Sequence, residues 1–500
     1  MSALLWMEKH CDGISRRITI AFLFFMKNDV TTNNANNGLA LVRPAIVPVL
    51  DPDFRPAVLA NRAFRQAAAK NPVPVSIALE RTDGGVSRFD TTIADSSLPE
   101  AEGNFFVVER LVKFLLWSRG GWKVYFSGPA DLGRRLQSHY RETTTGRFDA
   151  DLMGRKIYEK PFEVVLVSPD QMPEAKEMTA PLGRHLDGCR IGFDLGASDR
   201  KVAAVIDGMT VFSDETVWDP RSQSDPQWHF DQVMDSLKRA ASHLPRVDAI
   251  GGSSAGVYVN NRVQVASLFR GVPEDLFNQR VKTLFFELKK AWNNIPFDVV
   301  NDGEVTALAG SMALNDNAVL GIALGSSQAV GYVTPEGNIT SWVNELAFAP
   351  VDYNPDAPVD EWSGDHGCGV QYFSQQCVGR LIPKAGIEMD ATLPLPEKLV
   401  EVQKLMARGD ERALKIYQTI GTYLGYAVAH YAEFYDIRHL LILGRVTTGK
   451  GGEVILQGSK EVLEREFPEL ASKIALQMPD EKSKRHGQAM AAASLPVVKA

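Results

Sequence analysis

One aspartate is a candidate for chemistry because a predicted buried strand delivers it to a defined place. In the stretch 299–310, VVNDGEVTALAG, Asn301 and Asp302 come directly after two β-branched apolar residues. Small and aliphatic residues follow at helical spacing, which predicts a strand, a loop and then a helix. A carboxylate held rigidly at a strand end suits the role of a general base. The pair by itself is also compatible with an ordinary turn or a helix N-cap.

Three other stretches bring small residues to the ends of hydrophobic strands. They are DLGAS at 194–198, ALGSSQ at 323–328 and ILGRVTTGKGG at 442–452. Glycine has no Cβ, and such turns present free backbone N–H groups, so they let the backbone approach phosphate oxygens closely. A single turn of this kind is typical of any hairpin. Three in this order, with Asp302 between the first and the second, favour a site for a phosphorylated ligand.

These stretches need an α/β framework in which several strands end near one another. From Cys189 onward, strands and amphipathic helices alternate in the pattern that predicts such a framework. The region before it, 41–187, predicts a hairpin around an Asp-Gly-Gly turn, an amphipathic helix at 104–119, and further strands and helices. A polar, proline-containing stretch, 168–187, is predicted to link the two regions. A capping or dimerising domain and a degenerate duplication of the second region are both open for the first.

The order of the motifs resembles the hexokinase–actin superfamily and, within it, the ROK family (repressor, open reading frame, kinase) of sugar kinases and sugar-responsive regulators. The resemblance covers about residues 190–495, and it implies that Asp302 is the catalytic base. It implies that Asp194 holds Mg²⁺ through water. The residues implied in nucleotide binding are Asp194, Gly196, Ser198, Gly325, Ser326, Ser327, Gly444 and Gly449. The residues implied in sugar binding are Gly256, Asn301, Glu345 and Phe348.

The sugar half of the pattern departs from the family. The family's Glu-x-Gly-His motif reads ELAFAPVD here, which keeps Glu345 and puts Phe348 in the place of the histidine. Gln371 stands near the position of a second sugar-contacting glutamate. At the adenosine loop Arg445 follows Gly444, where the family has a second glycine; this arginine could crowd the adenine, reach the phosphates or point to solvent.

The family's zinc motif is reduced as well. In DHGCGVQYFSQQC the spacing of His366, Cys368 and Cys377 does not match the family's, and no fourth ligand is visible. Zinc is therefore not expected, and inert thiols are the favoured interpretation.

The fold class predicted is α/β, a two-lobed actin/hexokinase-like (ribonuclease H-like) fold with an additional N-terminal α/β region. The predicted segments are a disordered leader (1–40), an N-terminal α/β domain of unknown role (41–187), a kinase-like N-lobe (188–310), and a kinase-like C-lobe with the sugar and adenosine loops (311–500).

The composition indicates which classes of partner and which cell compartment to expect. The net charge of −7 argues against a nucleic-acid surface and against attraction to anionic membranes. Four cysteines in 500 residues do not suggest a disulfide framework, so a cytoplasmic protein is expected. The sequence thus predicts a kinase that uses ATP and Mg²⁺ to phosphorylate a hydroxyl of a small-molecule sugar, with altered acceptor specificity. The alternative is a non-catalytic sugar- or nucleotide-sensing regulator on the same fold, and a homodimer is left open.

Overall fold

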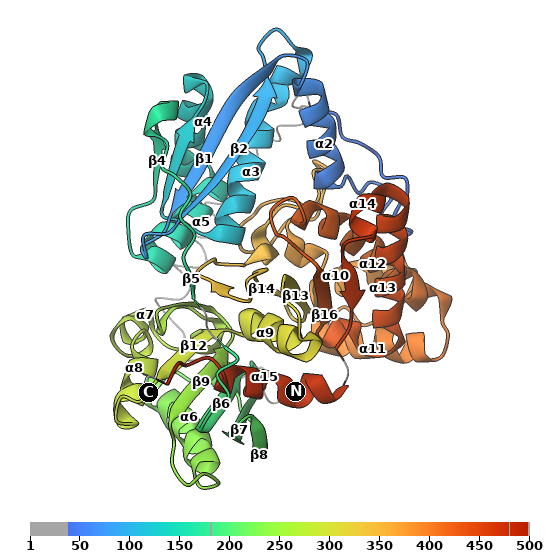
Figure 1. The fold of residues 1–500 in the computed structure, drawn as a ribbon. Coiled ribbons are helices and arrows are strands. Elements are labelled where there is room, and N and C mark those ends of the chain that lie inside the picture. Colours follow the sequence, from blue (N-terminus) through green and yellow to red (C-terminus); the bar gives the residue numbers. More distant parts are fainter. Residues whose placement is uncertain (1–38, 181–182, 480, 499–500) are drawn as a thin grey trace, which may run out of the picture. The chain divides into compact units, whose positions relative to one another are not determined.

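Two β-sheets with the same strand order form the part of the chain that carries Asp302 (Figure 1). The computed structural model describes residues 39–180, 183–479 and 481–498. In the first sheet the order is β12-β9-β6-β7-β8. Its strands are β6 (Cys189–Leu195), β7 (Asp199–Ile206), β8 (Met209–Val217), β9 (Ala249–Ser254) and β12 (Phe297–Asn301). Strand β7 is antiparallel to β6 and β8, whereas β9 is parallel to β6 and β12.

The second sheet repeats this pattern with one strand added, in the order β17-β16-β13-β14-β15-β5. Its strands are β5 (Thr179–Ala180), β13 (Val319–Leu324), β14 (Gln328–Val333), β15 (Ile339–Thr340), β16 (His439–Leu443) and β17 (Ala475–Gln477). Strand β14 is antiparallel to β13 and β15, whereas β16 is parallel to β13 and β17. Two successive sheets with this order and these directions make the two-lobed ribonuclease H-like arrangement. The predicted fold class is confirmed.

Helices cover both sheets because their central parallel strands are hydrophobic on both faces. Every residue of β6 is buried, for example. The helices of the first lobe are α6 (Pro226–Ala241), α7 (Glu274–Leu276) and α8 (Leu284–Ala291). Those of the second are α10 (Gln375–Lys384), α11 (Leu395–Ala407), α12 (Glu411–Tyr431), α13 (Lys450–Glu466) and α14 (Pro468–Ala471). Apolar side chains of α6 and α8 share a core with β6, β9 and β12.

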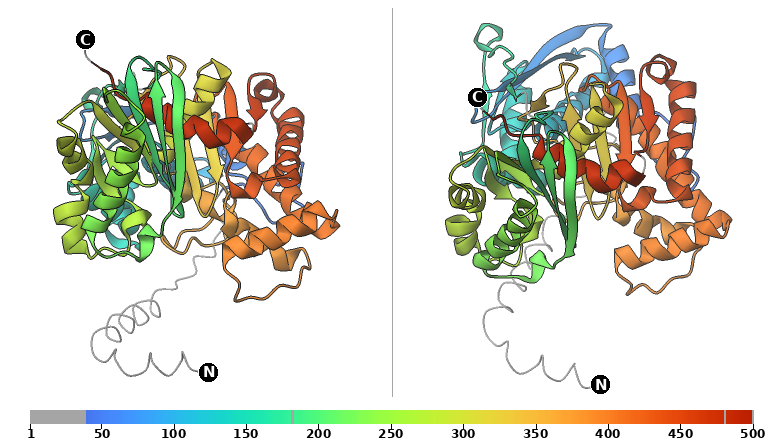
Figure 2. Two further views of the ribbon diagram at one scale, coloured as in Figure 1. Left: turned by 90° about the horizontal axis from the view of Figure 1, so that it is seen from below. Right: turned by 60° about the horizontal axis from the view of Figure 1, so that its bottom comes forward.

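Two helices join the sheets, α9 (Asp302–Leu314) and the C-terminal α15 (Glu481–Ala493). Figure 2 shows α15, in red, between the first sheet and the rest of the second lobe. It approaches the first sheet closely, because a Cβ added at Gly192 or at Gly251 would lie 1.7 Å from a carbonyl oxygen of the α15 backbone. The C-terminal helix therefore packs on the first sheet although it belongs by sequence to the second lobe.

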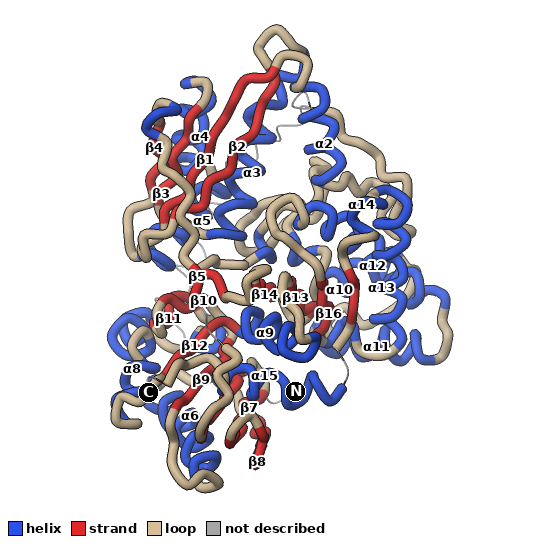
Figure 3. Tube along the Cα trace, viewed as in Figure 1, coloured by secondary structure: helices blue, strands red, loops and turns tan. Residues whose placement is uncertain are grey.

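The N-terminal region has its own sheet, in the order β2-β1-β3-β4 (Figure 3). The strands are β1 (Pro72–Glu80), β2 (Val86–Ala94), β3 (Lys123–Ser127) and β4 (Glu163–Leu166), and the helices are α2 (Ala57–Ala68), α3 (Asn104–Arg119), α4 (Ala130–Glu142) and α5 (Thr144–Ala150). The predicted hairpin and the predicted helix at 104–119 are confirmed. Strand β1 is antiparallel to both β2 and β3, and β3 is parallel to β4. The strands β8, β7, β6 and β9 of the first sheet have the same pattern of directions, but their order along the chain differs from that of β2, β1, β3 and β4.

The N-terminal region shares one hydrophobic core with the second lobe. The ring of Phe54, for instance, packs edge-on against Tyr423 of α12 at 4.8 Å. The stretch 168–187, predicted as a linker, also contributes β5, whose residues pair with β15. The region is thus built into the second lobe through both packing and a strand pair.

The predicted disordered leader, residues 1–40, falls outside the described residues except at its last two positions. Within the described part of the chain, no helix is both long and apolar enough to cross a membrane.

Candidate functional site

Asp302 is the first residue of α9 and follows β12 without an intervening loop. Asn301 is the N-cap: its side-chain oxygen accepts a hydrogen bond from the Gly303 backbone N–H at 2.7 Å. A carboxyl oxygen of Asp302 accepts from the same N–H at 3.0 Å. The predicted strand and helix are confirmed, but the loop predicted between them is absent, because the N-cap makes the turn within one residue. The carboxylate is fixed at the positive end of the helix dipole.

The environment of Asp302 makes it a better base than an exposed aspartate. Burial, followed by the negative charge of Asp194, raises the pKa of Asp302 to about 6. The effect of Asp194 also shows that the structure brings the two carboxylates together. At pH 7 the carboxylate of Asp302 is still mostly ionised, and its raised pKa strengthens its affinity for a proton.

Asp194 lies near the end of β6 and is almost fully buried. It accepts a hydrogen bond from the Ser253 hydroxyl at 2.6 Å, and the Lys201 ammonium lies 3.8 Å from its other oxygen. Burial is the largest influence on the pKa of Asp194, which it raises; the lysine acts against this. The same lysine contacts Asp199 at 3.3 Å. The first turn therefore carries two carboxylates and one ammonium.

Asn301 is oriented by the loop that contains Gly256. Its side-chain N–H donates to the Gly256 carbonyl at 2.6 Å, which brings two of the residues predicted to bind sugar into contact. Gly256 has φ of 134°, and an added Cβ would lie 2.5 Å from the Cβ of Ala266. A side chain does not fit here, so this position requires glycine. It precedes the short hairpin of β10 (Val257–Val259) and β11 (Arg262–Val265).

The first two predicted phosphate turns are both closed by a backbone hydrogen bond from a glycine, over four residues in the first turn and three in the second. The Gly196 N–H donates to the Asp199 carbonyl at 2.9 Å, and the Gly325 N–H donates to the Ser327 carbonyl at 2.9 Å. The residues at their tips, Ser198, Ser326 and Ser327, are exposed. Each turn closes a hairpin at the end of a central strand and exposes its serine side chains, although the Ser198 hydroxyl already donates to the Asp199 carboxylate at 2.9 Å.

The third turn lies against the other two. Gly444 has φ of 97°, and a Cβ there would lie 2.5 Å from the Leu324 carbonyl at the end of β13. The guanidinium of Arg445 donates to the Ser198 hydroxyl of the first turn at 3.5 Å. Gly449, with φ of 71°, precedes α13. Side-chain and backbone contacts thus connect the third turn with the second and the first.

Comparison with known proteins found similar chains among solved structures. No family model and no curated protein matches the chain. Among solved structures, a ROK hexokinase from Thermus thermophilus aligns with 16% identity and a TM-score of 0.48, over 62% of this chain and 98% of its own. A ROK family glucokinase from Streptomyces griseus, solved with glucose and AMPPNP, aligns with 19% identity and a TM-score of 0.47, over 61% and 98%. A ROK family transcriptional regulator, homologous to the E. coli MLC protein, aligns with 17% identity and a TM-score of 0.48, over 62% and 79%.

The fold resembles that of ROK proteins. The stretch that contains Glu345 and Phe348 is held by the N-terminal region. The Glu345 N–H donates to the Trp117 carbonyl at 2.8 Å, and the Phe348 ring packs against Trp117 at 4.3 Å and Phe148 at 5.6 Å. Phe348 is half-buried. This group of rings makes one side of the candidate site apolar.

The carboxyl of Glu345 has a different protonation state from that of Asp302. Burial, followed by the charge of Asp302, raises the pKa of Glu345 to about 8. At pH 7 this side chain is therefore mostly protonated and can donate a hydrogen bond to a ligand. The site thus combines an ionised carboxylate, Asp302, with a neutral carboxylic acid, Glu345.

The three residues that were considered as zinc ligands, His366, Cys368 and Cys377, have other surroundings in the structure. A ring nitrogen of His366 lies 2.9 Å from the Ala357 carbonyl, and the Cys368 thiol donates to the Asp365 carbonyl at 3.9 Å. Burial raises the pKa of both thiols, that of Cys377 to about 11, so both are protonated at neutral pH. Among the described residues there is no group of three or more His, Cys, Asp or Glu side chains that could hold a metal.

Several residues at the site were missed by sequence reasoning. Ser253 lies three positions before Gly256, and only Gly256 was singled out in this part of the sequence. Lys201 lies three positions beyond the first turn, and a lysine on a strand carries no special signal. Trp117 belongs to the N-terminal region, and nothing in the sequence connects it with Glu345.

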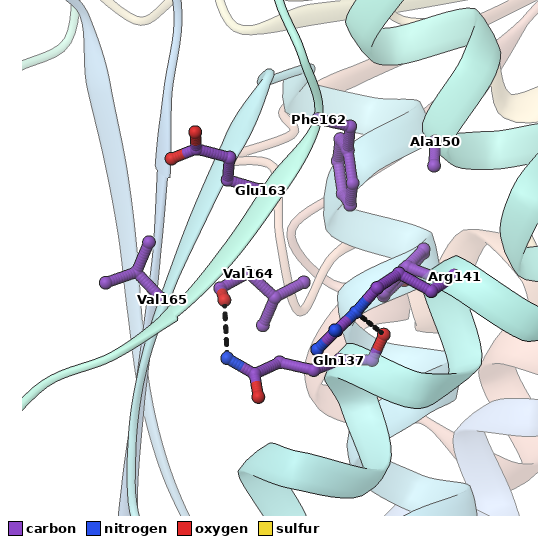
Figure 4. A pocket seen from close by; sticks show the side chains of 8 residues that line it. Gln137, Arg141, Ala150, Phe162, Glu163, Val164 and Val165 are labelled. Atoms are coloured by element: carbon purple, nitrogen blue, oxygen red, sulfur yellow. Dashed lines mark hydrogen bonds between the residues drawn. The ribbon is translucent and has the colours of Figure 1, made fainter.

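Two cavities border the described elements. The one in Figure 4, about 270 Å³, lies between α4 and β4, where the Gln137 amide donates to the Val164 carbonyl at 2.9 Å. It contains none of the predicted site residues. The other, about 300 Å³, is lined by Tyr258 and Glu304, among others, and so reaches the neighbourhood of Asp302.

Proposed function

We propose that the chain is an ATP-dependent sugar kinase of the ROK type with altered acceptor specificity. The observation that carries the proposal is the Asp302 carboxylate, partly buried at the start of α9 with its pKa raised to about 6, beside Asp194 and the three small turns. A general base needs a pKa close to the working pH and a fixed position, and Asp302 has both. A cytoplasmic location belongs to the same proposal, and a homodimer is left open.

In the proposed reaction Asp302 accepts the proton of the sugar hydroxyl. The hydroxyl oxygen forms a bond to the γ-phosphorus of ATP while the bond from that phosphorus to the bridging oxygen breaks, and ADP leaves. Glu345, neutral at pH 7, donates a hydrogen bond to a second sugar hydroxyl. Asn301 contributes a side chain whose orientation is fixed by Gly256.

In the proposed nucleotide site, backbone N–H groups and positively charged side chains face the phosphates. The turns at Gly196, Gly325 and Gly444 offer N–H groups to the phosphates, and Lys201 and Arg445 provide positive charge nearby. Asp194 fits Mg²⁺, because this ion commonly takes one or two carboxylates, often through water, together with phosphate oxygens. When bound, Mg²⁺ would neutralise charge that develops on the phosphates.

A non-catalytic sensor is the second candidate, and Lys201 favours it. Its ammonium lies 3.8 Å from Asp194 and 3.3 Å from Asp199, so it supplies a positive charge that a metal ion would otherwise provide. A sensor would bind sugar or nucleotide at this site without turning over.

A coupled assay of ADP release with a panel of hexoses, N-acetylhexosamines and polyols separates the two candidates. The kinase proposal expects turnover that requires both a sugar and Mg²⁺. Absence of turnover across the panel, together with a sugar-dependent rise in Tm, would support the sensor and contradict the kinase.

The pH dependence of kcat/KM for the sugar is expected to be bell-shaped. Asp302 acts deprotonated, so activity rises as the pH passes through about 6, and Glu345 acts protonated, so activity falls as the pH passes through about 8. Glu345→Gln keeps an N–H donor at every pH and is expected to remove the alkaline limb. Glu304, whose burial also raises its pKa to about 8, is the matched control: Glu304→Gln should leave both limbs in place. An alkaline limb that survives in Glu345→Gln contradicts the role of Glu345.

The Arg445→Ala variant tests the position of the guanidinium at the first turn. If Arg445 reaches the phosphates, the KM for ATP should rise about three- to tenfold while the KM for the sugar stays constant, because a charge-assisted hydrogen bond is lost. Arg408→Ala, an exposed arginine at the end of α11, is the control. A fall in the KM for ATP would mean instead that the arginine crowds the nucleotide.

A further inference from the structure

A buried group of charged side chains connects α3 with a loop of the second lobe. We name it the α3 charge cluster; its members are Glu109, Arg110, Lys113, Asp149 and Asp365. Arg110 donates to both oxygens of Glu109 at 2.5 and 2.8 Å and to Asp365 at 2.9 Å. The Lys113 ammonium contacts Asp149 at 2.9 Å and Asp365 at 3.1 Å. Three of the members belong to α3, Asp149 belongs to α5, and Asp365 belongs to the loop before α10.

The cluster contributes more to the geometry of the groups around it than to the stability of the fold. Lys113 and Asp149 are fully buried, and removing such charges from water costs much of what their attraction returns. Hydrogen bonds to carboxylates are directional, however, so the cluster fixes the geometry of whatever else binds to the same oxygens. For Asp149, that further partner is the indole N–H of Trp117, at 2.9 Å.

Trp117 connects the cluster with the candidate sugar site. Its carbonyl accepts the Glu345 N–H at 2.8 Å, and its ring packs on Phe348 at 4.3 Å. The neighbouring Ser118 carbonyl accepts the Asn344 N–H at 3.1 Å. Side chain and backbone at the end of α3 therefore hold both ends of the stretch 344–348.

The cluster is also connected with Phe348 through the loop before α10, to which Asp365 belongs. Asp365 takes part in the cluster, and its carbonyl accepts from the Cys368 thiol. Cys368 belongs to a small buried group with Ala347 and Val370, against which Phe348 packs. The stretch with Glu345 and Phe348 is thus held between two parts that are joined by one set of buried ion pairs.

We propose that Trp117 is a positioning residue of the acceptor site, and that the N-terminal region is an integral part of that site. Through Trp117 the α3 charge cluster sets the position of Glu345, the hydrogen-bond donor, and of Phe348, the apolar side. This inference rests on the proposed function. It gives the region 41–187 a role in recognition of the sugar, because the stretch 344–348 takes its position from α3.

The first test is kinetic and uses Trp117→Leu and Trp117→Phe. For Trp117→Leu the KM for the sugar is expected to rise about tenfold or more, while the KM for ATP stays within about twofold, because a small displacement of binding groups weakens recognition of the acceptor. Trp117→Phe keeps a ring against Phe348 and should give an intermediate value. Leu136→Ala removes a buried side chain of the same region on a different helix, α4, and should leave the KM for the sugar unchanged. Equal changes of the two KM values in both Trp117 variants, or an effect of Leu136→Ala as large as theirs, would overturn the proposal.

The second test does not depend on activity. In the full-length protein, hydrogen exchange of a peptide that covers 344–349 should accelerate about tenfold or more in Trp117→Leu, since the bond from the Glu345 N–H is loosened. Exchange there should stay as in the wild type in Leu136→Ala. If the wild type turns over no sugar but the exchange prediction holds, the proposed kinase function fails while the positioning by Trp117 stands. Unchanged exchange in Trp117→Leu overturns the positioning itself.

Discussion

The Asp302→Asn variant is expected to lose about 100- to 10,000-fold in kcat, the usual contribution of a positioned general base. Asparagine keeps the size of the side chain, and its carbonyl oxygen can still accept the Gly303 N–H, so α9 should begin at the same residue. Only the affinity for the substrate proton is lost. The measurement is kcat from ADP release at pH 7.5, with the KM for the sugar determined in parallel.

Glu304→Gln is the matched control for this variant. Glu304 lies two residues from Asp302 and is mostly protonated at pH 7, so its amide analogue changes little charge, and kcat should stay within about twofold. The helix should be preserved in both variants, which circular dichroism can check. Equal turnover of wild type and Asp302→Asn would remove Asp302 from the role of base.

The Lys113→Met variant is expected to lower the free energy of unfolding by about 3–5 kcal/mol, because it leaves a buried carboxylate without its cation. Asp149 would keep only the Trp117 indole as a described hydrogen-bond donor, whereas Asp365 would keep Arg110. The loss can be measured as a shift of the urea unfolding midpoint. It is the largest effect on stability that we expect from a single substitution at the cluster.

Two further variants define the cause. In the double variant Lys113→Met/Asp149→Asn the unpaired charge is gone, so part of the lost stability should return. Lys123→Met breaks only a partly exposed pair with Glu163, at 3.7 Å, and should cost less than about 1 kcal/mol. If Lys113→Met cost no more than Lys123→Met, the α3 charge cluster would not hold the two parts of the chain together.

The local elements of this protein were predictable where the sequence has a clear period. The helix at 104–119 matches α3 residue for residue, because its apolar spacing favours a helix and the glycine after it marks the end. The prediction of a single buried face was wrong, because every residue from 112 to 119 is buried, charged side chains included. The hairpins of β6 with β7 and of β13 with β14 were marked by hydrophobic runs on either side of small residues. The stretch 168–187 was predicted as a linker because a strand of two residues, β5, has no detectable pattern.

The candidate site was predictable to a similar degree. Asp302 and Asp194 were found because each lies at the end of a hydrophobic strand, and the structure brings them together. The contact of Asn301 with Gly256 joins residues that the resemblance had grouped without geometry. The protonation states were not predictable, because the pKa values depend on burial and on a neighbouring carboxylate, Asp194 for Asp302 and Asp302 for Glu345.

The sequence by itself determined the fold class and the strand-end carboxylates, since both follow from local patterns of apolar and small residues. Only the tertiary structure decided what surrounds them. Lys201 reaches Asp194 through a strand pair, and Trp117 reaches Glu345 and Phe348 from a helix more than two hundred residues away. Such contacts are set by how the sheets and helices pack, and a single sequence carries no local signal for them. For this reason the reaction type can be proposed from the chain alone, whereas the shape of the acceptor site required the fold.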